Sequence, residues 1–170
     1  MRTRAAVLVI AAGAALDLVA KAWARAALEP YGAASGFLPF VSLRLTFNEG
    51  VSFSLLSFDR ERGRLALLAA TGLLTALVAV WALRSQGWER LGFSMITAGA
   101  LANLMDRAAF GAVTDFLGLH LGAWHPFVFN LADVWISLGV ALLLIAPFLS
   151  GWARKTAPPR PGRGTEGSDA

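Results

Sequence analysis

Two aspartates on either side of one short connection are the residues of this chain best suited to chemistry. Asp115 lies in "GAVTDFL", and Asp133 lies in the otherwise uncharged segment "FNLADVWISLGVALLLIAPFL". Two carboxylates held close together cannot both ionise easily, so one keeps a proton while the other acts as a base. Such a pair can activate water against a peptide carbonyl and protonate the leaving amine. Spacing alone leaves an alternative open, in which each aspartate caps a helix or pairs with Arg107.

Other polar side chains recur at helical spacing within apolar segments. They form three sets: Asp17, Lys21 and Arg25; Asn103, Asp106 and Arg107; and Asn130 with Asp133. Residues three or four apart share one face of a helix, so each set forms a polar stripe. Charges inside a membrane are costly and usually face a partner, a cavity or a substrate. For Asp17 and Lys21 the pattern favours an ion pair that neutralises itself and lets the helix insert.

Other chemistries have weaker support in the sequence. The chain has no cysteine, which excludes disulfides, thiolate zinc sites and a cysteine nucleophile. His120 and His125 are five residues apart with no glutamate between them, a pattern more typical of ordinary interfacial histidines than of a metal site. A Ser–Lys catalytic dyad could use Lys21, but Asp17 is its better partner and no serine is an obvious nucleophile. We therefore predict neither a metal nor a cofactor.

The elements that carry these residues are predicted to be membrane helices. Of the 170 residues 56% are hydrophobic and 15% charged, against about 25% charged in average soluble domains. The mean hydropathy is +0.60. Four apolar segments are close to the ~20 residues that a bilayer requires; they cover residues 5–28, 65–83, 91–108 and 127–149. We predict a mainly α-helical integral membrane protein with four transmembrane helices in one domain, residues 1–152, and a disordered cytoplasmic tail, residues 153–170.

The distribution of basic residues predicts the orientation. A net charge of +4 would suggest a nucleic-acid partner in a soluble protein, but here the basic residues fall largely at segment ends and in the tail. An arrangement with both termini in the cytoplasm puts eight of the 15 there: Arg2, Arg4, Arg84, Arg90, Arg154, Lys155, Arg160 and Arg163. Asp115 and Asp133 then lie near the outer boundary of the membrane. The first segment also has features of a cleaved signal peptide ending at Ala14, although its helical character continues beyond that residue.

A short β element is predicted in the outer loop, at about residues 37–57. Apolar and polar residues alternate from Val41 to Asn48 and again from Val51 to Leu55, on either side of Glu49–Gly50. Alternation around a glycine turn is typical of a β-hairpin with one apolar face. Such a hairpin either lies on the bilayer surface or only covers the end of the bundle.

Four motifs in this order resemble the lipoprotein signal peptidase family, signal peptidase II. They are "DLVAK" from Asp17, "NEGVSF" with Asn48, Gly50 and Phe53, "NLMDRAAFGAVTDF" from Asn103, and "FNLADVWI" from Phe129. The resemblance covers Ala5 to about Leu149. Each motif alone is modest evidence, but the ordered combination is highly specific. Ala102 stands where the family often has glycine, which predicts slightly different helix packing there.

The resemblance implies a function and a set of site residues. It implies an aspartic endopeptidase of the bacterial cytoplasmic membrane that removes signal peptides from prolipoproteins immediately before a cysteine bearing diacylglyceryl. Asp115 and Asp133 would be the catalytic pair. The residues supporting the site or binding substrate would be Asn48, Gly50, Asn103, Arg107, Asn130, Asp17 and Lys21, while Asp106 would serve the structure.

The same resemblance implies the partners: prolipoproteins and membrane lipid, no nucleic acid, and a monomeric enzyme. The rival hypothesis is a four-span carrier or assembly protein that uses Asp17, Lys21 and Asp133 for polar packing. It predicts that replacing Asp115 or Asp133 by asparagine leaves the activity intact or harms only folding.

Overall fold

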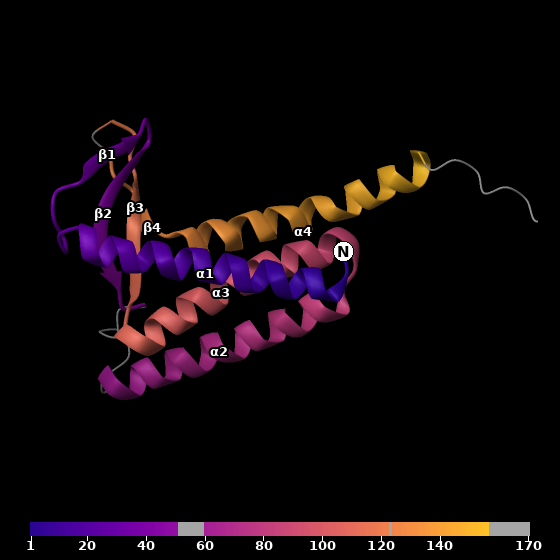
Figure 1. The fold of residues 1–170 in the computed structure, drawn as a ribbon, viewed down its shortest axis with the longest axis horizontal. Helices are drawn as coiled ribbons and strands as arrows, with labels where there is room; N and C mark the ends of the chain where they lie inside the picture. The colour runs from indigo at the N-terminus through magenta and orange to yellow at the C-terminus, as the bar shows by residue number, and fades with distance from the viewer. Residues whose placement is uncertain (51–59, 123, 157–170) are drawn as a thin grey trace, which may run out of the picture.

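The computed structural model describes residues 1–50, 60–122 and 124–156. Within these ranges, long helices form a bundle with a small sheet at one end (Figure 1). The helices are α1 (Thr3–Ala27), α2 (Arg60–Arg84), α3 (Gly87–Phe110) and α4 (Leu131–Thr156). The strands are β1 (Ser35–Leu38), β2 (Val41–Asn48), β3 (Val113–Leu119) and β4 (Val128–Phe129).

Three helical segments of the described chain are long and apolar enough to cross a membrane: Thr3–Ala27, Glu61–Arg84 and Leu131–Phe148. The third predicted span corresponds to α3, which is not among them, so a count of four spans stays a prediction. The reason lies in the packing, because α3 contacts α1, α2 and α4. A helix enclosed by three others can carry polar side chains on its inner faces, and these lower its hydropathy.

Glycines bring α3 and α4 into close contact. A Cβ atom on Gly99 would clash with the backbone oxygen of Ala132, and one on Gly139 would lie 2.6 Å from the backbone oxygen of Gly92. Small residues at helix interfaces let backbones approach closely, which is the usual way that membrane helices pack. This contact sets the beginning of α4 directly beside α3, where Asn103 lies.

The sheet is antiparallel throughout, with the strand order β1-β2-β3-β4. The predicted strand over 41–48 is confirmed as β2, whereas the predicted return strand over 51–55 lies outside the described residues. The partners of β2 are β1 and β3, and its pairing with β3 sets Thr46 opposite Asp115. The pattern did not reveal β3, because residues 113–118 are all buried and therefore lack the alternation of a strand with one exposed face.

The fourth predicted span, residues 127–149, begins and ends differently in the structure. Its first residues form β4, and the helix begins only at Leu131, after Asn130. At its other end α4 continues to Thr156, so the first four residues of the predicted tail are helical. The rest of the tail, residues 157–170, lies outside the described chain.

Candidate active site

Asp133 lies in the first turn of α4, where it takes part in a reciprocal cap with Asn130. The backbone N–H of Asp133 donates to Asn130 Oδ1 at 3.0 Å, and the backbone N–H of Asn130 donates to Asp133 Oδ2 at 3.2 Å. Two backbone donors at the start of the helix are thereby satisfied, as in a capping box. The beginning of a helix also favours negative charge, which suits a carboxylate at this position. The helix-capping alternative considered from sequence is therefore part of the geometry of Asp133.

Asp115 reaches the same place from β3. Its side chain accepts hydrogen bonds from Asn130 Nδ2 at 2.6 Å and from Asn48 Nδ2 at 3.3 Å, and the residue is 4% exposed. Burial raises the pKa of Asp115 to about 6, helped by the negative charge of Asp133, while the two amide hydrogen bonds oppose the shift. Asn130 bonds both aspartates, so one amide side chain links the two carboxylates that the sequence singled out.

Asn103 connects α3 to Asp133 in one defined orientation. Its Nδ2 donates to Asp133 Oδ1 at 3.1 Å, while its Oδ1 accepts from Lys21 Nζ at 2.6 Å and from Asn130 Nδ2 at 3.2 Å. Because Lys21 can only donate, the amide oxygen must face the ammonium group and the NH2 group must face the carboxylate.

The predicted ion pair between Asp17 and Lys21 is present in α1. Lys21 Nζ lies 2.7 Å from Asp17 Oδ2, and both side chains are fully buried. The pair also reaches other helices, because Asp17 Oδ1 accepts from the backbone N–H of Ala132 at 2.8 Å and Lys21 bonds Asn103. Asp17 thus satisfies a further donor at the beginning of α4, next to Asp133. The pair is a cross-link between helices as well as a way to neutralise charge.

A second polar cluster, Arg25 with Asp106 and Thr114, lies beside Asp115. Arg25 Nη1 donates to Asp106 Oδ1 at 2.8 Å and to Thr114 Oγ1 at 2.7 Å. Sequence reasoning assigned Asp106 to structure and gave no role to Thr114. The signal for Arg25 was its place on the stripe with Asp17; for Thr114 there was none, because its hydroxyl meets its partners only in the folded chain.

Gly50 and Asn48 form a turn that orients an amide toward Asp115. The backbone N–H of Gly50 donates to Asn48 Oδ1 at 3.0 Å, which leaves Asn48 Nδ2 facing Asp115. Gly50 has φ +94°, a backbone conformation that favours glycine. A Cβ atom there would lie 2.5 Å from the end of the Leu67 side chain of α2, which is flexible, so it is the backbone conformation that favours glycine.

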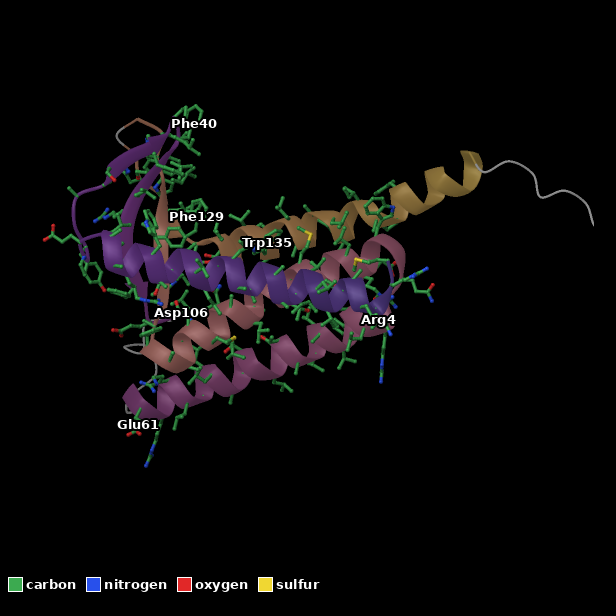
Figure 2. The ribbon with its side chains drawn as sticks, in the orientation of Figure 1. Arg4, Phe40, Glu61, Asp106, Phe129 and Trp135 are labelled. Carbon is green, nitrogen blue, oxygen red and sulfur yellow. The ribbon has the colours of Figure 1, made fainter. Side chains whose placement is uncertain are left out.

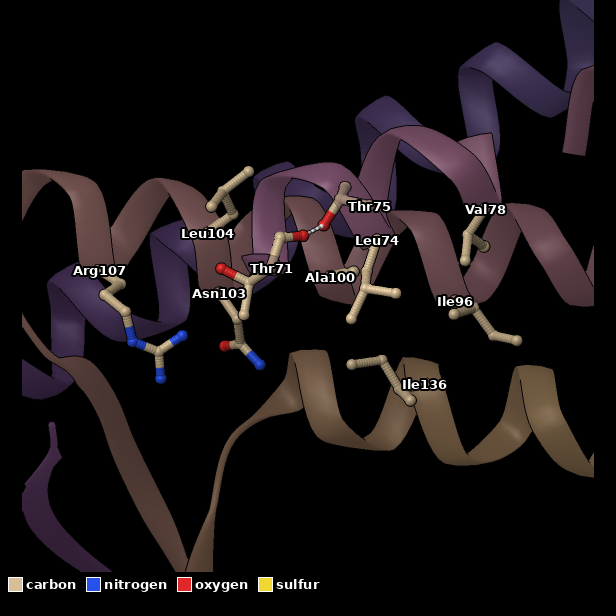
Figure 3. Close-up of a pocket in the computed structure, with 10 residues that line it drawn as sticks. All are labelled: Thr71, Leu74, Thr75, Val78, Ile96, Ala100, Asn103, Leu104, Arg107 and Ile136. Carbon is tan, nitrogen blue, oxygen red and sulfur yellow. Dashed lines mark hydrogen bonds between the residues drawn. The ribbon is translucent and has the colours of Figure 1, made fainter. Parts of the chain in front are cut away.

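Arg107 lies on α3, one turn beyond Asn103, and lines a cavity between α2, α3 and α4 (Figure 3). In the described residues it makes no ion pair with either Asp115 or Asp133, contrary to the alternative considered from sequence. The cavity has a volume of about 280 Å³. Asn103 also lines it, and the remaining lining is mainly apolar and comes from Thr71, Leu74, Thr75, Val78, Ile96, Ala100, Leu104 and Ile136.

A second cavity, of about 250 Å³, adjoins Asp133. Its lining is Phe127, Phe129, Asp133, Val134, Ser137 and Leu138. Asp133 is thus the carboxylate that faces open space, whereas Asp115 is enclosed. Both cavities combine an apolar lining with polar groups of the site, as is typical of ligand-binding pockets.

The histidines lie apart from this network. The rings of His120 and His125 are 5.7 Å apart between centroids, in the connection between β3 and β4. No cluster of three histidine, aspartate or glutamate side chains that could hold a metal ion occurs in the part of the chain that the structure describes. The arrangement around Asp115 and Asp133 is instead that of two interacting carboxylates oriented by amides, which is suited to acid–base activation of water.

Comparisons with known proteins point to one family. Residues 9–149 match the family model described as signal peptidase (SPase) II. Lipoprotein signal peptidases of Brucella ovis and Brucella melitensis are 36% identical to the chain over 127 residues, 74% of this chain and 78% of each relative. Two solved bacterial membrane enzymes share the fold with TM-scores of 0.70 and 0.72, at 22% and 20% identity. The alignments cover 92% and 84% of this chain and 94% and 92% of those enzymes.

Proposed function

Because this chain belongs to the signal peptidase II family, we propose that it is an aspartic peptidase in which Asp115 and Asp133 cleave signal peptides from prolipoproteins. The observation that carries the proposal is the link through Asn130, which hydrogen-bonds both carboxylates. Members of this family are peptidases, so the family match argues against the carrier hypothesis. The aspartic mechanism and the roles of individual residues are our inference from the geometry.

The two carboxylates take different roles in the proposed mechanism. Asp133 faces a cavity and accepts a backbone N–H at the beginning of α4, so it is the base that takes a proton from the attacking water. Asp115 is buried, and its pKa, raised to about 6, keeps the protonated form accessible near neutral pH, so it donates a proton to the amide nitrogen as the C–N bond breaks. Water supplies the oxygen of the new carboxyl group, and the pair is reset by one proton transfer.

The amides around the pair hold these roles in place. Asn103 and Asn130 orient Asp133 and Asp115, and Asn48 adds a second amide to Asp115. Lys21 and Asp17 fix Asn103 and the beginning of α4. Arg107 has donors directed into the cavity between α2, α3 and α4, where they are available to the backbone carbonyls of a bound signal peptide (Figure 3).

We further propose four membrane spans, with the pair near the outer face of the bacterial inner membrane and both termini in the cytoplasm. A helix of the length of α3, 24 residues, spans roughly 36 Å, enough to cross a hydrocarbon core. In Figure 1 the N-terminus lies at the end of the bundle away from the sheet, and α4 runs toward that end. This supports an arrangement in which the sheet and both carboxylates share one side of the membrane.

The exposed apolar residues at the edge of the sheet are consistent with a lipid-modified substrate. Phe37, Leu38 and Phe40 are more than half exposed around the β1–β2 turn, and Phe40 lies at the tip farthest from the helices (Figure 2). Exposed apolar side chains beside a membrane bundle fit contact with lipid chains. We therefore propose that the substrate is the precursor whose cysteine carries diacylglyceryl, held by a monomeric enzyme with this edge against the membrane.

The test is cleavage of a diacylglyceryl-modified prolipoprotein by the purified protein in lipid vesicles. Asp115→Asn and Asp133→Asn are each expected to lower kcat by at least about 10³-fold, because each removes one half of the proton-transfer pair. The matched control is Glu89→Gln, the same chemical change on an exposed carboxylate near the other end of α3, which should cleave like the wild type. Full activity in either aspartate variant would disprove the mechanism, and no cleavage by folded wild type would disprove the function.

A further inference from the structure

Arg25 lies at the sheet end of the polar stripe of α1, and its partners belong to two other elements. Its Nη1 donates to Asp106 Oδ1 of α3 at 2.8 Å and to Thr114 Oγ1 of β3 at 2.7 Å. The guanidinium also lies over the Phe110 ring, with Cζ 4.0 Å from the ring centroid. The Arg25 side chain is 22% exposed, so most of it is enclosed by the elements that it joins.

These contacts close into a ring of three hydrogen bonds. The backbone N–H of Thr114 donates to Asp106 Oδ2 at 2.7 Å, so Asp106 holds Arg25 with one oxygen and Thr114 with the other. Asp106 is 1% exposed and Thr114 is fully buried. Figure 2 shows Asp106 where α1 and α3 approach the strands. Charged hydrogen bonds shielded from water are stronger than neutral ones, so the ring fixes α1, α3 and β3 together.

Thr114 transmits this constraint to Asp115, the next residue of β3. Successive side chains of a strand point to opposite faces, so the ring holds one face of β3 while Asp115 projects from the other. The carbonyl of Thr114 also accepts from Asn130 Nδ2 at 3.4 Å, the same nitrogen that bonds Asp115. Arg25 therefore touches neither carboxylate of the pair but holds the backbone from which one of them projects.

We propose that Arg25 is a positioning residue for the reaction, which through Thr114 keeps Asp115 in place against Asn130 and Asp133. This inference rests on the proposed catalytic pair and extends it to a residue outside the motifs that define the site. Displacement of a reacting group by about 1 Å can lower a rate roughly 10²-fold, so a ring that restrains β3 has a measurable catalytic effect.

The experiment compares kcat, KM and the pH profile of kcat for Arg25→Met, Thr114→Val and the double variant on the modified prolipoprotein. Each single change is expected to lower kcat about tenfold and leave KM within about twofold, because neither side chain lines either of the two cavities beside the pair. The double variant should be no slower than the slower single variant, because both changes remove one shared contact. Thr114→Ser retains the hydroxyl and should recover most of the wild-type kcat.

The matched control is Arg4→Met, the same change near the other end of α1, where the side chain points away from the bundle (Figure 2). A smaller folded fraction would lower kcat equally at every pH. A displaced Asp115 instead moves the midpoint of the pH profile upward by about half a unit or more, because the amide hydrogen bonds that lower its pKa are weakened. A pH profile that keeps its midpoint in both single variants overturns the proposal.

Thr114→Val decides the matter if Arg25→Met fails to fold, because it removes one hydroxyl and leaves the backbone bond to Asp106 intact. Full kcat in folded Thr114→Val overturns the inference, as do losses that multiply in the double variant. Either of these results would leave the proposed function intact, provided that the wild type cleaves the substrate and Asp115→Asn does not. No cleavage by the wild type overturns both.

Discussion

The two carboxylates of the site are held in contrasting ways. Asp115 projects from a strand, is nearly enclosed, and receives its hydrogen bonds from the side-chain amides of Asn48 and Asn130. Asp133 projects from the first turn of a helix, borders a cavity, and receives a backbone N–H as well as the amide of Asn103. The contrast shows that two residues of one type meet different surroundings, one enclosed and one beside a cavity, when different elements carry them.

One residue and one helix serve both carboxylates. Asn130 belongs to the cap of Asp133 and also donates to Asp115, so it links the two environments. In α1, Lys21 bonds Asn103 on the Asp133 side, while Arg25 bonds Thr114 on the Asp115 side. Substitutions at these positions therefore test the surroundings of each carboxylate separately.

Replacing Lys21 tests the Asp133 side and should have the largest effect. Lys21→Met leaves Asp17 as a buried charge without its partner and frees the amide of Asn103, so we expect a loss of about 3–5 kcal/mol in the free energy of unfolding. Thermal unfolding in detergent micelles measures it. The matched double variant Asp17→Asn with Lys21→Met removes both charges, while asparagine can still accept from Ala132, and should recover much of the stability. An equally unstable double variant would contradict the ion pair as the cause.

Titration of Asp115 tests the contrast between the carboxylates in a second way. Its pKa of about 6 in the folded protein exceeds the ordinary 3.8, so its contribution to stability is fully present below pH 3.8 and is lost once the pH has risen through 6. The loss is on the order of 3 kcal/mol. Asp115→Asn cannot lose a proton, so its melting temperature relative to wild type should rise between pH 4.5 and about 7. Glu89→Gln provides the control, and a pH-independent difference for Asp115→Asn would refute the raised proton affinity.

Replacing Asn130 separates its two roles, the cap beside Asp133 and the hydrogen bond to Asp115. We expect the smallest of the three effects here. Asn130→Ser keeps an oxygen that can cap α4 but removes the amide that donates to Asp115 at 2.6 Å. We expect stability near that of wild type and a fall in kcat of roughly 10²-fold, equivalent to about 2.7 kcal/mol. Asn130→Ala removes the cap as well and should cost about 1 kcal/mol more in stability. Equal stability of the serine and alanine variants would show that the cap contributes nothing.

Part of this arrangement could be predicted because it depends on local sequence. The spacing of Asp17 and Lys21 predicted a shared face and an ion pair, and the alternation over Val41–Asn48 predicted a strand, both of which the structure confirms. The three apolar helices followed from hydropathy. The strand that carries Asp115 could not be recognised in this way, because burial on both faces removes the alternating pattern.

The order of residues is enough to tell which of them carry charge, which segments are apolar enough for a membrane, and which side chains share a helix face. Charge and apolar character belong to the residues themselves, and the shared face follows from the helical period, which sets residues three or four apart side by side. The folded chain was needed to learn that Asp115 and Asp133 meet through Asn130, and that Lys21 and Arg25 bond Asn103 and Thr114. Contacts over such separations depend on how closely the elements approach one another, and between α3 and α4, where Asn103 bonds Asp133, glycines set that distance.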